Sequence, residues 1–501
     1  MRRILLKVSR NLKTLFIVLS LCSIAAMVFR ADTLSWDRAA LALAIAWVGL
    51  VPGLCFIATP FKNRPPFPLM SMVGLFYIVF FGLSAFFAAY LRNNDSGMIN
   101  FFGISFLDEI SIRAQVLVLI GMTLMFLFWA VSKRVIFSRI PRFSLPNHYS
   151  SWRLQTLIWG LVIGNLLYIH FPIVRSLPSI GQILQPAGYV GFALVLALLY
   201  QHSLNRWQSL AYFTIIFPLW VLGLLEAGSL TPLMLIGGLW IAEHLYFRAR
   251  MPWMWMLTLA VFLAISYPIM SGYRSLTNQM KEDRAGISDH RILPNQLGPQ
   301  RSAEKLKLIS DAFSNLVELD KKALYERSVG IVRRTGLIFA FSKVVEETPE
   351  KIPYWDGETY KPMVTSWIPR MLWKNKPQEK SGYAFGYRYS LIGLADKHMS
   401  YNLPWVTELY VNFGPAGVIL GMSLIGLFLG LLECIFNRIG QNVVEYGIGA
   451  AILIPLSFQE SNFTLMTGSL LPLAVCLWLY FTIGLRFAAK KDNTHLYSGR
   501  A

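Results

Sequence analysis

The sequence predicts an all-α polytopic membrane protein with about 12 transmembrane helices and one large, partly helical loop before the tenth span. Hydrophobic residues make up 55% of the 501 residues and charged residues only 15%, whereas a soluble domain is about 25% charged. Apolar runs close to the ~20 residues that cross a bilayer recur along the chain. Basic residues cluster in every second connection between these runs, as cytoplasmic loops require.

The apolar runs are separated by short polar connections, which favour antiparallel helix pairs. The first run follows a basic N-terminus and resembles a secretory signal. Ser23-Ile24-Ala25 is a poor cleavage site, so an uncleaved signal anchor is the preferred interpretation and a cleaved signal the alternative. The predicted spans are 13–29, 39–59, 68–91, 114–132, 154–174, 187–203, 208–226, 230–247, 252–272, 413–436, 443–459 and 465–486.

Orientation follows from the basic residues, because Lys and Arg accumulate on the cytoplasmic side. Both termini are therefore predicted to be cytoplasmic, and residues 273–412 to face outward, into the periplasm of a Gram-negative cell. The basic positions on the predicted cytoplasmic side are Arg2, Arg3, Lys7, Arg10, Lys13, Lys62, Arg64, Lys133, Arg134, Arg139, Arg142, Arg206, Arg248, Arg250, Arg438, Arg486, Lys490 and Lys491.

The span assignment divides the chain into three regions. Residues 1–272 form a nine-helix transmembrane region, 273–412 a large periplasmic loop, and 413–501 a three-helix transmembrane region with a cytoplasmic tail. Within the loop, apolar residues at helical spacing predict an amphipathic helix over 303–328. A shorter helix is predicted at 336–347, and an ordered loop rich in aromatic residues, Gly and Pro at 352–403.

Several functional classes are excluded or disfavoured. The excess of 46 Lys and Arg over 27 Asp and Glu is explained by cytoplasmic loops, so no nucleic-acid partner is predicted. Phosphate-binding, dinucleotide-binding, metalloprotease and serine-hydrolase motifs are all absent from the sequence. The seven histidines do not cluster and the four cysteines lie in apolar runs, so neither a metal site nor a cofactor is predicted.

The segment 366–390 interleaves basic and aromatic residues. Aromatic rings stack on sugar faces and Arg side chains bind phosphate oxygens, so this segment could bind a phosphorylated glycan. An interfacial helix anchored by Trp and Lys explains the same pattern equally well. The basic residues are Arg370, Lys374, Lys376, Lys380 and Arg388, and the aromatic residues are Trp367, Trp373, Tyr383, Phe385, Tyr387 and Tyr389.

A second basic group precedes this segment. Arg333 and Arg334 are adjacent and could bridge a diphosphate, although such a pair is more often a solvated surface. Residues 273–403 hold 21 Lys and Arg against 15 Asp and Glu. This excess on a predicted outer loop favours an anionic ligand.

Glu408 is the carboxylate best placed for chemistry, because it precedes the tenth span by a few residues. A carboxylate at a membrane boundary is costly unless it is paired or functional; simple hydration at the outer surface is the alternative. Other groups at predicted outer helix ends are His170, Arg175, Glu226, Arg274 and Glu460. Those at inner ends, which we expect to pair with cytoplasmic Arg, are Glu243, His244, Glu433 and Glu445.

The run IPRMLWKNKP (368–377), the Gly- and Tyr-rich stretch after it, and TELYVNFGPAGVILGMSLIGLFLG (407–430) resemble the Wzy-type O-antigen and exopolysaccharide repeat-unit polymerases. The likeness covers about 352–430; the first nine spans match only in layout. It implies a fold of the broad membrane glycosyltransferase (GT-C-like) group, in the bacterial inner membrane.

The resemblance also implies a reaction and its partners. Such enzymes transfer a growing glycan from undecaprenyl pyrophosphate to the non-reducing end of a new lipid-linked repeat unit, without a metal or a nucleotide sugar. The partners implied are the lipid-linked donor and acceptor, the bilayer and a chain-length regulator. The polymer could be O-antigen, capsule or exopolysaccharide.

Site roles are then expected for the matching residues. The departing pyrophosphate needs cations, for which Arg370, Arg333, Arg334, Lys376, Arg274 and Arg388 are the candidates. The acceptor hydroxyl needs a base, expected to be Glu408, with His398 or Asp396 as substitutes. Sugar contacts are expected from Trp367, Trp373, Tyr383 and Tyr410.

Two other functions remain open from the sequence. An O-antigen ligase uses the same lipid donor but transfers the glycan to lipid A-core. A flippase or exporter of lipid-linked sugar also suits twelve spans, although no internal repeat is visible and a transporter does not need a 140-residue outer loop. A non-catalytic assembly subunit is the remaining possibility.

Overall fold

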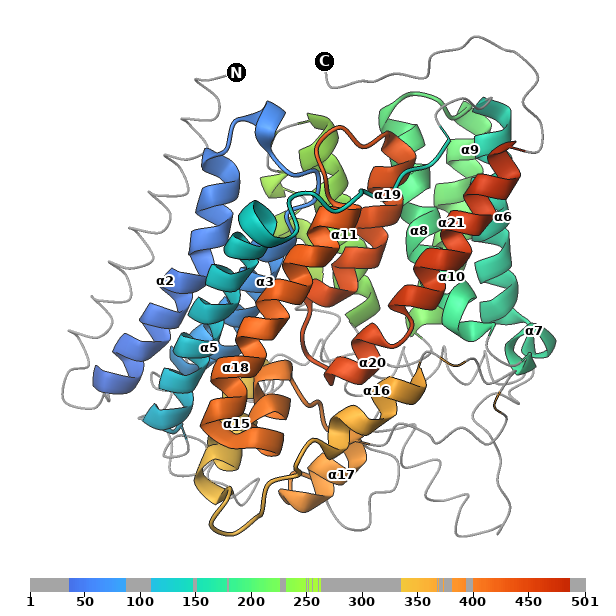
Figure 1. Cartoon of the computed structure of the whole chain (residues 1–501). Coiled ribbons are helices and arrows are strands. Elements are labelled where there is room, and N and C mark those ends of the chain that lie inside the picture. Colours follow the sequence, from blue (N-terminus) through green and yellow to red (C-terminus); the bar gives the residue numbers. More distant parts are fainter. Residues whose placement is uncertain are drawn as a thin grey trace, which may run out of the picture. The chain divides into compact units, whose positions relative to one another are not determined.

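The computed structural model is all-helical, with no strand in the residues it describes (Figure 1). It describes residues 36–86, 110–146, 151–177, 180–225, 231–248, parts of 250–262, 335–366, 368, 373, 381–392 and 400–486. The predicted helical class is therefore confirmed. The three regions 1–272, 273–412 and 413–501 stay a prediction.

Two compact units divide the described residues. The first combines 36–145 with 335–475, and the second combines 146–262 with 476–486, apart from the gaps given above. The first unit thus joins segments from both sides of the second one in the sequence. The boundary falls inside helix α21, Leu470–Arg486.

The first unit contains the longest helix of the described chain, α18, which spans Trp405–Phe436. It packs along α5, Ile112–Val131; α2 packs against α5, and α3 packs against α2. Its remaining elements are α2 (Trp36–Ala58), η1 (Phe61–Asn63), α3 (Leu69–Tyr77), η2 (Ile78–Leu83), η3 (Ser132–Ile136), α15 (Leu337–Glu347), η5 (Glu358–Tyr360), α16 (Lys361–Ser366), α17 (Ser381–Arg388), α19 (Val443–Leu453), η6 (Ile454–Ser457) and α20 (Phe463–Thr467).

Small residues explain the close packing of α18 on α5, which run side by side in Figure 1. A Cβ atom at Gly426 would collide with the backbone carbonyl of Met125, so only glycine permits this approach. Close backbone approach is how membrane helices gain packing energy, because lipid supplies no hydrophobic driving force between them. The α5–α18 pair is therefore closely packed.

The second unit pairs α6, Ser151–His170, with α8, Gly181–Tyr200. The Asn165 amide nitrogen connects them by donating to the Leu184 carbonyl over 2.6 Å. This side chain is buried, which is tolerated because its polar hydrogens find a backbone acceptor. The other elements are α7 (Pro172–Ser176), α9 (Arg206–Ala211), η4 (Tyr212–Ile216), α10 (Phe217–Leu225) and α11 (Thr231–Arg248).

Seven helices of the described chain are long and apolar enough to cross a membrane: Asp37–Ala58, Leu69–Phe86, Ile112–Ile136, Gly181–Tyr200, Arg206–Leu224, Trp405–Phe436 and Phe463–Leu485. Each coincides with a predicted span. Helices also form over the predicted spans 154–174 and 230–247, as α6 and α11, without belonging to these seven. The predicted span 13–29 lies outside the described residues, and 252–272 is described only in part.

The predicted span 443–459 differs from the structure. It forms the 11-residue helix α19 and a 3-10 turn over Ile454–Ser457, and this apolar segment is shorter than the 18 residues counted for a span. The α-helix stops near Pro455, which lacks an amide hydrogen and cannot continue the hydrogen-bond ladder. The count of about 12 spans therefore stays a prediction that this segment does not support.

The loop before α18 is more helical than expected. The predicted helix at 336–347 is confirmed as α15, Leu337–Glu347. The stretch 352–403, expected as ordered loop, contains α16 and α17 in its described part. The predicted helix 303–328 lies outside the described residues.

Candidate functional site

Helix α18 breaks near its start. Gly414 has φ 62° and ψ −153° inside the helix, and Pro415 follows it. A Cβ atom at Gly414 would lie 2.5 Å from the hydroxyl oxygen of Tyr354, so both the positive φ and the close approach require glycine. Residues 405–413 therefore form a separate helical segment, redirected relative to the membrane-crossing part.

This first segment carries Glu408, whose side chain is completely buried. One carboxylate oxygen accepts a hydrogen bond from the backbone N–H of Phe463 over 2.7 Å, at the start of α20. A charge-assisted bond of this kind is about twice as strong as a neutral one. The carboxylate thus joins the starts of two helices that are 55 residues apart in the sequence.

Asn412 extends the network by one helical turn. Its amide nitrogen donates to the Glu408 carbonyl oxygen and to the Thr359 hydroxyl, each over 2.8 Å. The Thr464 hydroxyl donates to the Thr359 carbonyl over 3.3 Å. These bonds bring α18, η5 and α20 together around one carboxylate, and we call Glu408, Asn412, Thr359, Tyr360 and Thr464 the Glu408 network.

The Tyr360 phenol lies within electrostatic range of the Glu408 carboxylate. Burial raises the pKa of the Tyr360 phenol well above its ordinary value of 10, and the Glu408 carboxylate adds to the increase. The Tyr360 ring stacks on Phe413, with 6.1 Å between ring centroids. The phenol is therefore neutral at physiological pH and keeps its O–H available as a hydrogen-bond donor.

Unmade hydrogen bonds accompany this network. The Thr407 hydroxyl, the Asn412 amide oxygen and the Trp405 indole N–H are buried without a hydrogen-bond partner among the described residues. Buried polar groups in native proteins are normally satisfied by protein or ordered water. Three such groups within eight residues leave polar atoms without a partner among the described residues at the start of α18.

A basic and aromatic group lies in the part of the same unit that precedes α18 in the sequence. The Arg388 guanidinium lies 5.2 Å from the centroid of the Trp355 ring and donates to the Pro353 carbonyl over 2.7 Å. Trp355 is itself attached to α18, because its backbone N–H donates to the Val411 carbonyl oxygen over 3.0 Å. The side chains of Arg388 and Tyr383, both on α17, are partly exposed, so the guanidinium retains N–H groups that can meet an anion.

The structure describes five of the predicted site residues. Glu408 lies at the centre of the network above, Arg388 and Tyr383 lie on α17, and Trp373 is exposed. Tyr410 is fully buried, with its hydroxyl 3.3 Å from the Thr348 carbonyl oxygen that accepts its hydrogen bond. Tyr410 therefore packs beneath the surface in this structure, and its predicted sugar contact stays untested.

The other predicted site residues lie outside the described residues: Arg274, Arg333, Arg334, Trp367, Arg370, Lys376, Asp396 and His398. Their predicted roles stay predictions. Sequence reasoning missed Thr359, Tyr360 and Thr464. No local signal marks them, because they meet Glu408 only through tertiary packing; Asn412, four residues after Glu408, was detectable by helical spacing.

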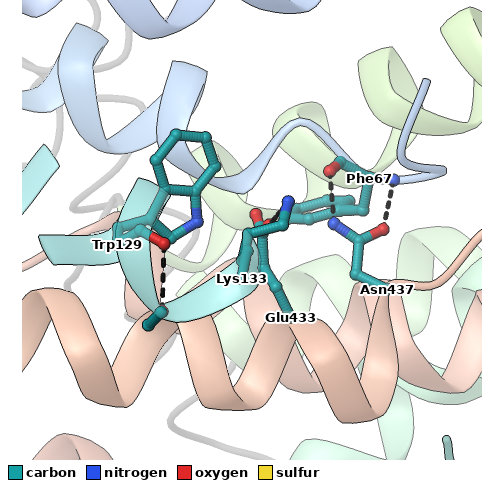
Figure 2. A network of polar contacts seen from close by, with 6 residues as sticks. Phe67, Trp129, Lys133, Glu433 and Asn437 are labelled. Carbon is teal, nitrogen blue, oxygen red and sulfur yellow. Dashed lines mark hydrogen bonds and ion pairs between the residues drawn. The ribbon is translucent and has the colours of Figure 1, made fainter. Parts of the chain in front are cut away.

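A second polar network lies near the opposite end of α18 (Figure 2). Lys133 forms an ion pair with the buried Glu433, and its ammonium lies 4.8 Å from the Trp129 ring centroid. Asn437 both accepts from the N–H and donates to the carbonyl of Phe67, each over 2.7 Å. These contacts connect α5, α18 and the segment before α3, which is a packing role.

The sequence predicted that carboxylates at inner helix ends pair with Arg, and for Glu433 and Glu445 this prediction was wrong. Glu433 pairs with Lys133 instead, because η3, which directly follows α5, packs against α18 and places Lys133 opposite it. Glu445 accepts hydrogen bonds from the backbone N–H groups of Leu145 and Asn442, over 2.8 and 3.0 Å. Neither carboxylate oxygen of Glu243 has a partner among the described residues.

One sequence family matches the chain over residues 300–482: Domain of unknown function (DUF8712). The matched range contains the whole Glu408 network and α17. No curated protein and no solved structure matches the chain.

Proposed function

We propose that the chain polymerises undecaprenyl pyrophosphate-linked oligosaccharide repeat units at the periplasmic face of the bacterial inner membrane. It transfers the growing glycan to the non-reducing end of a new lipid-linked unit, in the synthesis of O-antigen, capsule or exopolysaccharide. The observation that carries the proposal is the Glu408 network. It places a buried carboxylate beside neutral hydroxyl and amide groups, inside the segment that resembles the Wzy-type polymerases.

The proposed reaction needs a base for the acceptor. A sugar hydroxyl that attacks the anomeric carbon must lose its proton, and a carboxylate within hydrogen-bond reach can accept it. Glu408 is the proposed base, with one oxygen oriented by the Phe463 N–H. Because the Glu408 side chain is buried, the residues that cover it must move before an acceptor hydroxyl can reach it. A purely positioning role for Glu408 would not require such a movement.

The leaving group needs cations, because negative charge grows on the pyrophosphate as the glycosidic bond breaks. Arg388 supports this part of the proposal, since its guanidinium is held on Trp355 while part of it stays exposed. Arg370, Lys376, Arg333, Arg334 and Arg274 are proposed to complete the group from the sequence alone. Neither a metal nor a cofactor is part of the proposal.

The test is the electrophoretic profile of surface and lipid-linked glycan from a deletion strain. Loss of the long-chain ladder with retention of a band bearing one repeat unit is the expected result. Long chains that accumulate on lipid without transfer to core would instead identify a ligase. Single units trapped on the cytoplasmic face would identify a flippase.

A further inference from the structure

A buried carboxyl group in the second unit has no part in the proposed reaction. Glu243 lies in the penultimate turn of α11, and its exposed fraction is 0%. Its neighbours on that helix are apolar and buried, including Leu239 and Ala242. Neither of its oxygen atoms has a hydrogen-bond partner or an ion-pair partner among the described residues.

Each of the other buried acids of the described chain has at least one hydrogen-bond or ion-pair partner. Glu433 contacts Lys133, Glu445 accepts two backbone N–H groups, and Glu408 accepts the Phe463 N–H. Glu460 accepts a hydrogen bond from the Asn402 amide. Glu243 differs from them in having no hydrogen-bond donor or cation against its carboxyl among the described residues.

An unpaired ionised carboxylate in an apolar, buried environment is far more costly than the neutral acid. We infer that Glu243 is a proton-binding site, a buried carboxyl on α11 that carries its proton at neutral pH. The ligand of this site is the proton itself.

A chain of polar side chains lies beside this carboxyl. The Tyr200 hydroxyl, at the end of α8, is hydrogen-bonded to His244 Nδ1 over 3.0 Å and receives a hydrogen bond from the Trp240 side chain. Tyr200 is also within electrostatic range of Glu243. Tyr200 and the partly exposed His244 thus form a hydrogen-bonded pair within electrostatic range of the carboxyl, although neither makes a hydrogen bond to Glu243.

The charged and titratable groups around Glu243 are few. On α11 they are His244, Tyr246 and Arg248, and on α8 Tyr189 and Tyr200; α10, which also packs on α11, carries none. The Arg248 guanidinium lies 5.9 Å from the Tyr200 ring centroid and is exposed. No cation among the described residues lies against the Glu243 carboxyl as Lys133 lies against Glu433.

Infrared spectroscopy of the full chain in lipid nanodiscs tests the inference. The spectrum of wild type minus Glu243→Gln is expected to contain the carbonyl stretch of a neutral carboxylic acid, from mildly acidic to mildly alkaline pH. Glu243→Asp is expected to shift this band instead of removing it.

The matched control is Glu433→Gln, which removes a buried but ion-paired carboxylate. Its difference spectrum is expected to contain carboxylate bands only. Thermal unfolding separates the two acids as well: Glu433→Gln is expected to lower the melting temperature, whereas Glu243→Gln leaves it near that of wild type. Carboxylate bands, and no neutral-acid band, in the Glu243 difference spectra would overturn the inference.

Discussion

Glu408 is the residue on which the proposed chemistry depends most directly. Its carboxylate is buried, oriented by a backbone N–H and close to a phenol that remains neutral. Replacement by glutamine keeps the shape and one acceptor oxygen for the Phe463 N–H, but removes the negative charge. The variant therefore separates charge from packing.

For Glu408→Gln we expect loss of long glycan chains and accumulation of single lipid-linked units, with turnover reduced by about 10²-fold or more, as for loss of a general base. Glu460→Gln is the control, because Glu460 is also buried and hydrogen-bonded in the same unit. If Glu408 is the base, its protonation lowers the wild-type rate at low pH, and this decrease is expected to be absent from the pH–rate profile of Glu408→Gln. A normal polymer ladder in Glu408→Gln would assign the base to another residue.

Arg388 allows a second test at the residue scale. Arg388→Ala is expected to slow polymerisation roughly 10- to 100-fold, from the ~1.5–3 kcal/mol of a hydrogen bond to a charged group. Arg388→Lys keeps the charge but loses the planar fork, so partial activity is expected. Lys361→Ala, at an exposed position, is the control. Equal turnover in wild type and in the three variants would show that Arg388 is not one of the cations that bind the pyrophosphate.

At the scale of elements, the broken start of α18 determines where Glu408 lies. The break at Gly414 redirects residues 405–413 so that they contact η5 and α20. A continuous helix would carry Glu408 away from both. The break thus links a local backbone conformation to the geometry of the candidate site.

Gly414→Ala is expected to destabilise the fold by about 1–3 kcal/mol, the usual cost of a non-glycine residue in a strained backbone conformation. The new methyl group would also meet the Tyr354 hydroxyl. Thermal unfolding in nanodiscs measures the effect. Gly53→Ala is the control, because its Cβ would lie 4.0 Å from the nearest atom and φ is not positive there. An unchanged melting temperature in Gly414→Ala would show that the break is not required.

At the scale of the whole molecule, orientation in the bilayer is the property that the proposal needs. The first unit carries the Glu408 network near the start of α18 and the Lys133–Glu433 pair near its end. Because α18 is long enough to cross a membrane, the two networks are expected on opposite sides of it. The basic residues at 133–142 predict that the Glu433 end is cytoplasmic.

Cysteine labelling in intact cells tests this orientation. Single cysteines at Ser400 and Ser138, both exposed, are introduced into a chain whose native cysteines are replaced. A membrane-impermeant maleimide is expected to label Ser400→Cys from outside, and Ser138→Cys only after the membrane is opened. The reverse pattern would place the candidate site in the cytoplasm and contradict the proposed function.

The sequence determined the helical membrane class, the positions of most apolar helices and the short helix α15, because these depend on local composition and periodicity. It also indicated Glu408; Asn412, four residues later on the same helix face, was detectable by its spacing. The proposal that the segment 352–430 carries transferase chemistry rests on resemblance and awaits the glycan profile.

Only the tertiary structure decided what surrounds these residues. Thr359 and Phe463 contact the start of α18 across 53 and 55 residues of sequence, and the Lys133–Glu433 pair spans 300. Pro455 is visible in the sequence, but only the structure shows that the α-helix of the 443–459 run ends before it, and that Glu243 has no partner among the described residues. Periodicity reports which face of a helix is apolar, whereas side-chain partners depend on which helices pack together and at what register.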